Sequence, residues 1–124
     1  MGANSAGLHE DVEKLHPQTI DRHRAVASLM EELEAIDWYD QRIDAADDLE
    51  LKGLLAHNRD EEKEHAAMVL EWLRRHDGKL DQHLRTYLFT NKPLLQIEHA
   101  AEHGGAADGG GADDGSLGIG SLRR

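Results

Sequence analysis

Residues 51–72 read LKGLLAHNRDEEKEHAAMVLEW, and the side chains of this stretch repeat with the period of an α-helix. Positions spaced alternately four and three residues apart fall on one face of a helix. This face runs through Leu51, Leu55, Asn58, Glu62, His65, Val69 and Trp72. It is apolar at both ends and polar in the middle. We therefore expect a helix over about residues 49–75 that carries polar groups close to its core-facing side.

A second stripe with the same spacing lies upstream and predicts a long helix that begins at Pro17 or Thr19 and ends near Ala45. The stripe consists of Val26, Leu29, Leu33, Ile36, Asp40 and Ile43. The connection to the next helix is short, and Asp48 is a plausible cap for that helix. A short connection between two long helices predicts an antiparallel hairpin.

The chain after the hairpin carries weaker signals. Gly78 predicts the C-terminal stop of the second long helix. A short third helix is expected over about residues 80–89, and residues 94–103 indicate no more than a loose turn. Most of the glycines fall between residues 104 and 120, which is typical of a flexible linker.

The predicted fold class is all-α: an antiparallel two-helix hairpin plus a short C-terminal helix. Two amphipathic helices cannot cover each other's apolar stripes fully, so we expect two hairpins to pair into a four-helix bundle on dimerisation. The expected domain organisation is a flexible N-terminal segment (1–16), a helical domain (17–98), a flexible Gly-rich linker (99–115) and a C-terminal peptide (116–124).

The composition of the 124-residue chain excludes several classes of function. It has no cysteine, which excludes disulfides and thiolate metal sites. Its net charge is −11, and it lacks the basic surface that nucleic-acid-binding proteins use to contact phosphates. No apolar run is long enough for a membrane span, and no secretory signal begins the chain, so an intracellular location is expected. The acid-rich stretch 31–50 fits either a solvated face or a surface compensated by cations.

Glu62 and His65 form a Glu-x-x-His pair at positions i and i+3 of the second predicted helix, and Glu32 lies between apolar residues of the first. Di-iron helical bundles use a Glu from each of two helices and a Glu-x-x-His from each of two others. One chain holds half of that set, and a two-fold dimer would supply the rest. Carboxylate and imidazole ligands suit iron. The alternative interpretation is an ordinary charged helix face.

Other side chains give weaker signals. Tyr39, one heptad after Glu32, could donate a hydrogen bond to a ligand or could simply pack at an interface. Trp38 and Trp72 are interpreted as packing residues. The remaining histidines lack ligand spacing and are interpreted as surface residues: His9, His16, His23, His57, His76, His83, His99 and His103.

The assembled motifs resemble those of the encapsulated ferritins. The likeness rests on MEELEAIDWYDQR at residues 30–42 and HNRDEEKEHAAM at 57–68, and it continues in EWLRR at 71–75 and HLRTYLFT at 83–90. It covers about residues 19–92. The resemblance implies a subunit that dimerises into a ferritin-like bundle, with dimers arranged in a decameric ring.

The same resemblance implies a ferroxidase, an enzyme that oxidises Fe²⁺ to Fe³⁺ with dioxygen. Its di-iron ligands would be Glu32, Glu62 and His65, with Glu62 bridging the metals and Tyr39 beside the site. Glu31 and Glu34 would form an outer entry site that takes Ca²⁺ or another divalent cation.

The C-terminal stretch DGSLGIGSLRR, residues 114–124, resembles an encapsulin cargo-loading peptide. Leu117, Ile119 and Leu122 would fill pockets of the shell wall. This resemblance implies a cytoplasmic location inside an encapsulin nanocompartment, where iron would be mineralised and stored. Two other hypotheses remain open, namely a non-catalytic metal-binding cargo or packaging adaptor, and a purely structural helical oligomer.

Overall fold

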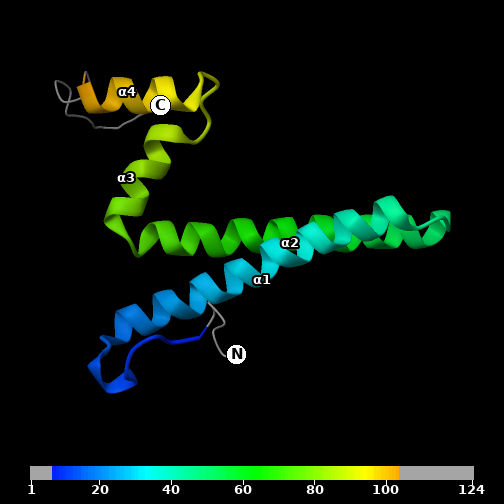
Figure 1. The fold of residues 1–124 in the computed structure, drawn as a ribbon, viewed down its shortest axis with the longest axis horizontal. Helices are drawn as coiled ribbons and strands as arrows, with labels where there is room; N and C mark the ends of the chain where they lie inside the picture. The colour runs from blue at the N-terminus through cyan, green and yellow to red at the C-terminus, as the bar shows by residue number, and fades with distance from the viewer. Residues whose placement is uncertain (1–6, 104–124) are drawn as a thin grey trace. The chain divides into compact units, whose positions relative to one another are not determined.

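The computed structural model describes residues 7–103, and within this range all regular structure is helical (Figure 1). A short 3-10 helix, Val12–Lys14, precedes α1 (Pro17–Ala45), α2 (Leu49–Arg75), α3 (Gly78–Tyr87) and α4 (Leu94–His103). The predicted all-α class is confirmed. The chain divides after His76 into two compact units, the first containing α1 and α2 and the second α3 and α4.

The α1–α2 hairpin follows the sequence prediction closely. Pro17 occupies the first turn of α1, where its missing N–H costs no helical hydrogen bond. Asp48 caps α2, and its carboxylate accepts a hydrogen bond from the Leu51 backbone N–H at 2.8 Å. The two helices run antiparallel, lying close together near the turn and separating toward the N-terminal end of α1 (Figure 1).

A lysine closes the turn between the two long helices. The Nζ atom of Lys52, on α2, donates to the backbone carbonyls of Ile43 at 2.7 Å and Ala46 at 3.1 Å. The last carbonyls of an α-helix lack intrahelical partners, and a positive charge there is favoured by the helix dipole. Lys52 therefore stabilises the C-terminal end of α1 from the neighbouring helix.

The role predicted for Gly78 is wrong. Its backbone does not adopt the left-handed conformation of a glycine stop, and α2 ends at Arg75, the predicted position, with His76 as its C-cap. Gly78 instead begins α3, because the Asp77 carboxylate accepts a hydrogen bond from the Leu80 backbone N–H at 3.0 Å and starts a new helix. An N-cap aspartate directly before the glycine was thus the stronger signal.

The remaining C-terminal boundaries also shift. The third helix runs over Gly78–Tyr87 instead of 80–89, because the backbone becomes extended at its C-cap Leu88, and Phe89 then has a positive φ of 62°. Residues 94–103 form the regular helix α4 instead of a loose turn. This helix includes residues 99–103, where the predicted linker starts. The rest of that linker and the predicted C-terminal peptide lie outside the described residues.

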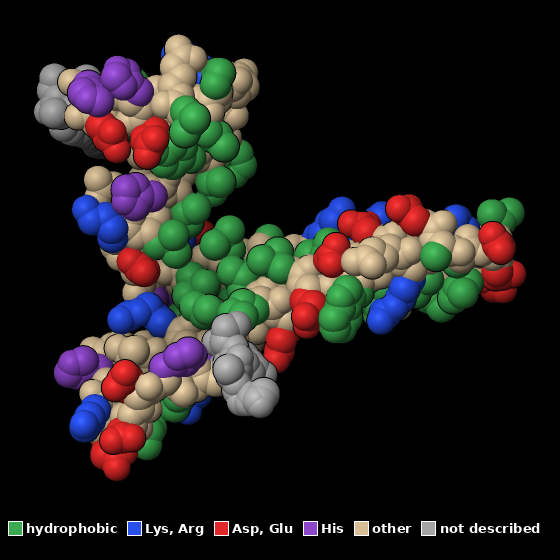
Figure 2. All heavy atoms as spheres, in the orientation of Figure 1, with side chains coloured by type: hydrophobic (Ala, Val, Ile, Leu, Met, Phe, Trp, Pro, Cys, Tyr) green, Lys and Arg blue, Asp and Glu red, His purple; other side chains and the backbone are tan. Residues whose placement is uncertain are grey.

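Few apolar side chains of the described residues are buried. Only Ala66 and Leu73 fall into the buried class. Members of the predicted apolar stripes stay accessible, such as Leu33, which is 54% exposed, and Trp72, which is 36% exposed. Hydrophobic side chains accordingly form patches on the surface of the hairpin (Figure 2). Two helices alone cannot enclose both stripes, as the sequence indicated.

One ion pair joins the two long helices where Asp40 interrupts the stripe of α1. The Arg59 Nη1 atom on α2 donates to the Asp40 carboxylate at 2.9 Å, and the Arg59 Nε atom donates to Asp60 at 3.2 Å. Arg59 is three-quarters buried, so this pair lies deeper than an ordinary surface pair. Asp40 is therefore a cross-helix partner and not a stripe residue.

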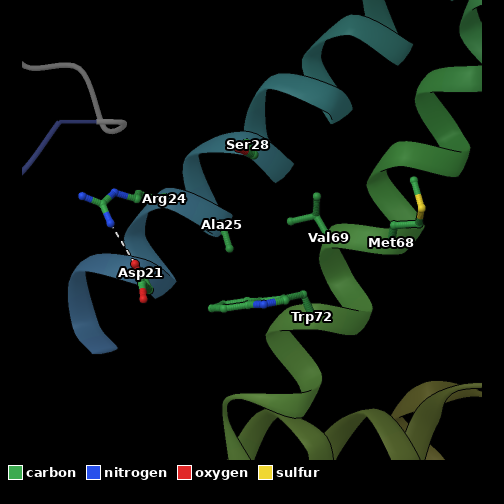
Figure 3. A pocket seen from close by; sticks show the side chains of 7 residues that line it. All are labelled: Asp21, Arg24, Ala25, Ser28, Met68, Val69 and Trp72. Atoms are coloured by element: carbon green, nitrogen blue, oxygen red, sulfur yellow. Dashed lines mark hydrogen bonds and ion pairs between the residues drawn. The ribbon is translucent and has the colours of Figure 1, made fainter. Parts of the chain in front are cut away.

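Toward the N-terminal end of α1 the hairpin opens into a groove of about 360 Å³ (Figure 3). Ala25 of α1 faces it from one side and Val69, Met68 and Trp72 of α2 from the other. An ion pair between Asp21 and Arg24, at 2.8 Å, lies at its rim. Of the described helices, none is long and apolar enough to cross a membrane.

Candidate metal centre

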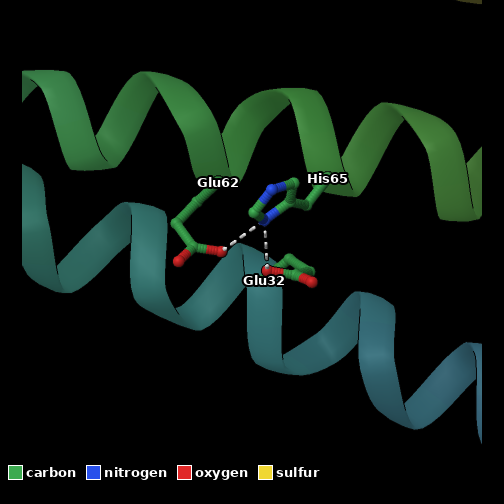
Figure 4. A group of neighbouring side chains, drawn as sticks. All are labelled: Glu32, Glu62 and His65. Atoms are coloured by element: carbon green, nitrogen blue, oxygen red, sulfur yellow. Dashed lines mark ion pairs between the residues drawn. The ribbon is translucent and has the colours of Figure 1, made fainter.

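Three side chains from the two long helices meet at the middle of the hairpin (Figure 4). The Nδ1 atom of His65 lies 3.5 Å from a carboxylate oxygen of Glu62 and 3.8 Å from one of Glu32. The three residues offer one ligand atom each, all within 4.8 Å of one another. Glu32, Glu62 and His65 are the residues that the sequence proposed for the iron site, and the structure brings them together in a cluster that could hold a metal ion.

The cluster follows from two local rules. Glu62 and His65 are three residues apart on α2, so their side chains project from the same helical face. The antiparallel pairing of the hairpin then brings Glu32 of α1 opposite that face (Figure 4). Placing these ligands at the helix pairing surface makes the site part of the packing between α1 and α2.

Burial of the cluster is partial. The side chains of Glu32 and Glu62 are 24% and 25% exposed, and that of His65 is 47% exposed. Two acids at this depth carry a desolvation cost that a cation would offset. The opening at His65 leaves the cluster accessible to solvent and ions.

The neighbours of Glu32 in the cluster change its acidity. The pKa of Glu32 is raised, first by the hydrogen bond with the Glu62 carboxyl, then by partial burial and by repulsion from Glu62. The His65 imidazole acts in the opposite direction, and the nearby Glu31 carboxylate adds to the rise. Repulsion between neighbouring acids disfavours the charged form, and a bound divalent cation would offset that repulsion.

The distances between the His65 nitrogen and the two carboxylates fit ligands arranged around a metal ion better than direct hydrogen bonds between the side chains. Separations of 3.5 and 3.8 Å between the imidazole nitrogen and the carboxylate oxygens exceed good hydrogen-bond lengths. Oxygen and nitrogen ligands of this kind suit iron and related divalent metals. The cluster supplies three ligand residues per chain, which is half of the set used by di-iron helical bundles.

The other predicted site residues lie outside this cluster. Glu31 and Glu34 are exposed on α1, and Glu31 reaches the cluster only through its charge. The ring of Tyr39 is half-buried and lies 5.6 Å from the Arg42 guanidinium, which also lies 5.9 Å from the Trp38 ring. Within one chain, therefore, Tyr39 makes a cation–π contact and takes no part in the cluster.

The family model described as EncFtn-like matches residues 7–91. This range contains α1, α2, α3 and every residue of the cluster. The chain belongs to the EncFtn-like family. The resemblance to encapsulated ferritins that the sequence motifs indicated is thereby confirmed.

Several relatives of known name support this membership of the EncFtn-like family. The chain is 59% identical to an encapsulated ferritin-like protein of Rhodospirillum rubrum, over 99% of this chain and 92% of that protein. It is 51% identical to a ferritin-like protein of Thermotoga maritima, over 77% and 84% of the two chains. It is 35% identical to the encapsulin nanocompartment cargo protein EncC of Myxococcus xanthus, over 75% and 77%.

A solved structure supports the fold of this EncFtn-like chain. The crystal structure of protein ne0167 from Nitrosomonas europaea superposes with a TM-score of 0.69 at 60% sequence identity. The match covers 71% of this chain and 97% of that one.

Proposed function

We propose that this protein is a ferroxidase that oxidises Fe²⁺ to Fe³⁺ with dioxygen at a di-iron site shared between two subunits. The observation that carries the proposal is the meeting of Glu32, Glu62 and His65 on the pairing surface of the hairpin. Fe²⁺ is the substrate, each ion gives up one electron, and dioxygen accepts the electrons. Membership of the EncFtn-like family supports an iron-related role.

Sharing between subunits follows from the ligand count and from the exposed apolar surface. One chain provides one Glu on α1 and one Glu-x-x-His on α2, and a two-fold axis presents the same ligands again. The stripes that the hairpin leaves accessible, including Leu33 and Trp72, supply the apolar area that a dimer would bury. Association would thus complete the four-helix bundle and the ligand set together, and dimers would form the larger, decameric ring.

The protein residues have distinct tasks in this proposal. Glu32, Glu62 and His65 would hold the iron, and the positive charge of the cation would offset the repulsion between the two neighbouring carboxylates. Tyr39 would donate a hydrogen bond beside the site of the assembled dimer. Glu31 and Glu34 would form an outer site for Ca²⁺ or another divalent cation, because acids opposed across an interface attract cations.

We further propose that the protein is cargo of an encapsulin shell in the cytoplasm, loaded by residues 116–124. The relative from Myxococcus xanthus is named as an encapsulin nanocompartment cargo protein, and the relative from Rhodospirillum rubrum as encapsulated. The spaced aliphatic residues Leu117, Ile119 and Leu122 are suited to pockets of a shell wall. Iron oxidised by the enzyme would then be mineralised and stored inside the compartment.

The deciding experiment is aerobic addition of Fe²⁺ to the purified full chain, followed by the absorbance of the ferric product. We expect oxidation well above the protein-free rate, lost in Glu62→Ala and retained in His83→Ala, an exposed histidine of α3. Wild-type activity in Glu62→Ala would refute the assignment. Tight Fe²⁺ binding without accelerated oxidation would support the alternative, a non-catalytic metal-binding cargo.

Encapsulin loading has its own test. Deleting residues 117–124 should abolish packaging into a co-expressed shell. It should leave oxidation intact, because the deletion removes none of the described contacts between helices. Packaging of the shortened chain at the wild-type level would show that the loading signal lies elsewhere.

A further inference from the structure

The second unit carries a pair of histidines that the iron chemistry does not use. His99 and His103 are four residues apart on α4 and therefore lie on the same face of that helix. Their ring centroids are 4.2 Å apart, with an angle of 32° between the ring planes. Histidine side chains gather at one end of α4 (Figure 2), and both residues are exposed.

A hydrogen bond fixes which nitrogen of His103 is available. The Nδ1 atom of His103 lies 3.0 Å from the His99 backbone carbonyl, which can only accept, so Nδ1 carries the proton. In the neutral ring the lone pair is then on Nε2, the other ring nitrogen. Metal-binding histidines are oriented in this way, with the second ring nitrogen donating to a carbonyl or carboxylate.

We propose that His99 and His103 form a chelating site for one divalent cation of the Cu²⁺, Ni²⁺ and Zn²⁺ class, separate from the Glu32–Glu62–His65 cluster. Two imidazole nitrogens on one zinc ion each lie about 2.0–2.1 Å from it, and are thus roughly 3–3.5 Å apart. The rings already adjoin, with centroids 4.2 Å apart, and chelation requires them to rotate until a lone pair of each points at the same ion. Water would complete the coordination.

The type of ligand separates this site from the iron cluster. The α4 pair consists of two imidazole rings, whereas the hairpin cluster consists of two carboxyl groups and one imidazole. Imidazole pairs suit Cu²⁺, Ni²⁺ and Zn²⁺, and Cu²⁺ heads the affinity series of divalent first-row metals. The hairpin cluster is the richer in oxygen and suits iron.

Chelation would also couple the ion to helix formation. The two rings adjoin only while the backbone between them is helical, so an ion bound by both stabilises α4. Short helices gain little stability from their own hydrogen bonds. An ion that links two side chains of this ten-residue helix should therefore increase its stability noticeably. Bound metal should therefore slow amide exchange along residues 94–103.

The test is a calorimetric Cu²⁺ titration of the full chain, with paramagnetic resonance of the bound ion. We expect His99→Gln and His103→Gln each to weaken one Cu²⁺ site per chain by roughly tenfold or more. The nitrogen hyperfine pattern should change in both. His83→Gln, with a lone histidine on α3, should bind as the wild type does. Equal affinities and spectra in the wild type and the His99→Gln/His103→Gln variant would overturn the proposal. An equal loss in His83→Gln would overturn it too, because it would indicate non-specific surface binding.

A second measurement keeps the inference independent of folding effects in the variants. Hydrogen exchange of the wild-type chain with and without Zn²⁺ should show added protection over residues 94–103. Unchanged exchange in this helix at saturating Zn²⁺ would contradict chelation by the pair.

Discussion

The two groups of candidate metal ligands differ in how much of the fold each requires. The hairpin cluster takes Glu32 from α1 and Glu62 and His65 from α2, so it exists only when the two long helices are paired. The α4 pair, His99 and His103, exists wherever one short helix forms. The geometry of a cluster that spans two helices can change when the hairpins assemble. The geometry of a pair within one helix depends mainly on whether that helix is formed.

The largest expected effect is on the rate of Fe²⁺ oxidation, which should depend on the hairpin cluster and not on the α4 pair. Glu32→Ala should lower Fe²⁺ oxidation by about 100-fold or more, because each substitution removes two ligands from a symmetric site. The double variant His99→Gln/His103→Gln should oxidise Fe²⁺ at the wild-type rate. Stopped-flow absorbance of both variants measures the contrast. Loss of oxidation in the histidine variant would mean that the pair belongs to the iron chemistry.

The second prediction concerns assembly. If Fe²⁺ binds the paired hairpins and not the single chain, iron at 100 times its dissociation constant favours the dimer by about 2.7 kcal/mol. Light scattering should show larger species with Fe²⁺ present, and Glu32→Ala should remove that response. Zn²⁺ bound at the α4 pair should leave the size of Glu32→Ala unchanged. A fully active monomer would contradict a site shared between subunits.

The third prediction weakens the hairpin while leaving α4 alone. Asp48→Ala removes the hydrogen bond that the Leu51 N–H makes at the start of α2, and should lower the free energy of unfolding by about 1 kcal/mol. Asp47→Ala, at the neighbouring position, is the matched control and should cost less. Denaturant unfolding measures both, and Cu²⁺ binding by the α4 pair should not change. An equal loss in the two variants would show that the cap bond does not decide the effect.

The smallest effect is a pH dependence that arises within α2. The Arg74 and Arg75 guanidinium groups lower the pKa of Glu71 to about 2, from an ordinary value of 4.5, and so favour its charged form in the folded chain. The stability that results is present above about pH 4.5 and is lost as the pH falls toward 2.

Because the Glu71 side chain is 40% exposed, solvent screens the pair, and the contribution should stay below about 1 kcal/mol. Glu71→Gln should therefore be less stable than the wild type at pH 7 and differ less at pH 3. Glu64→Gln, an exposed carboxylate on the same helix, is the control. A stability difference for Glu71→Gln that does not shrink in acid would refute the sign of this effect.

The hairpin could be predicted from sequence because its signals are periodic and local. The spacing of apolar residues defined both long helices, and Asp48 marked the start of the second. The three residues of the cluster could be predicted for the same reason, since Glu32, Glu62 and His65 each fall in register with an apolar stripe. Periodicity could not give the distances between these side chains across the hairpin, nor the raised pKa of Glu32 beside Glu62.

The helix boundary at Gly78 and the histidine pair of α4 could not be predicted, because neighbouring residues there favour different local structures. Gly78 was given the role of a stop because a glycine after a helix is a common terminator, but Asp77 caps a new helix there. His99 and His103 are among the histidines interpreted as surface residues for lack of ligand spacing, and both are exposed. Their spacing of four residues becomes meaningful only once α4 is known to be helical.

The sparse burial of the described residues has a thermal consequence. Exposure of apolar surface on unfolding is what gives folded domains a large heat-capacity increment, typically about 12–15 cal/mol/K per residue. A hairpin in which only Ala66 and Leu73 reach the buried class exposes little new apolar surface when it melts. Its increment as a single chain should lie below that range, which makes its stability change slowly with temperature and its melting broad. Packing of the apolar stripes against another copy would raise the increment, so scanning calorimetry should show a sharper transition as the protein concentration increases.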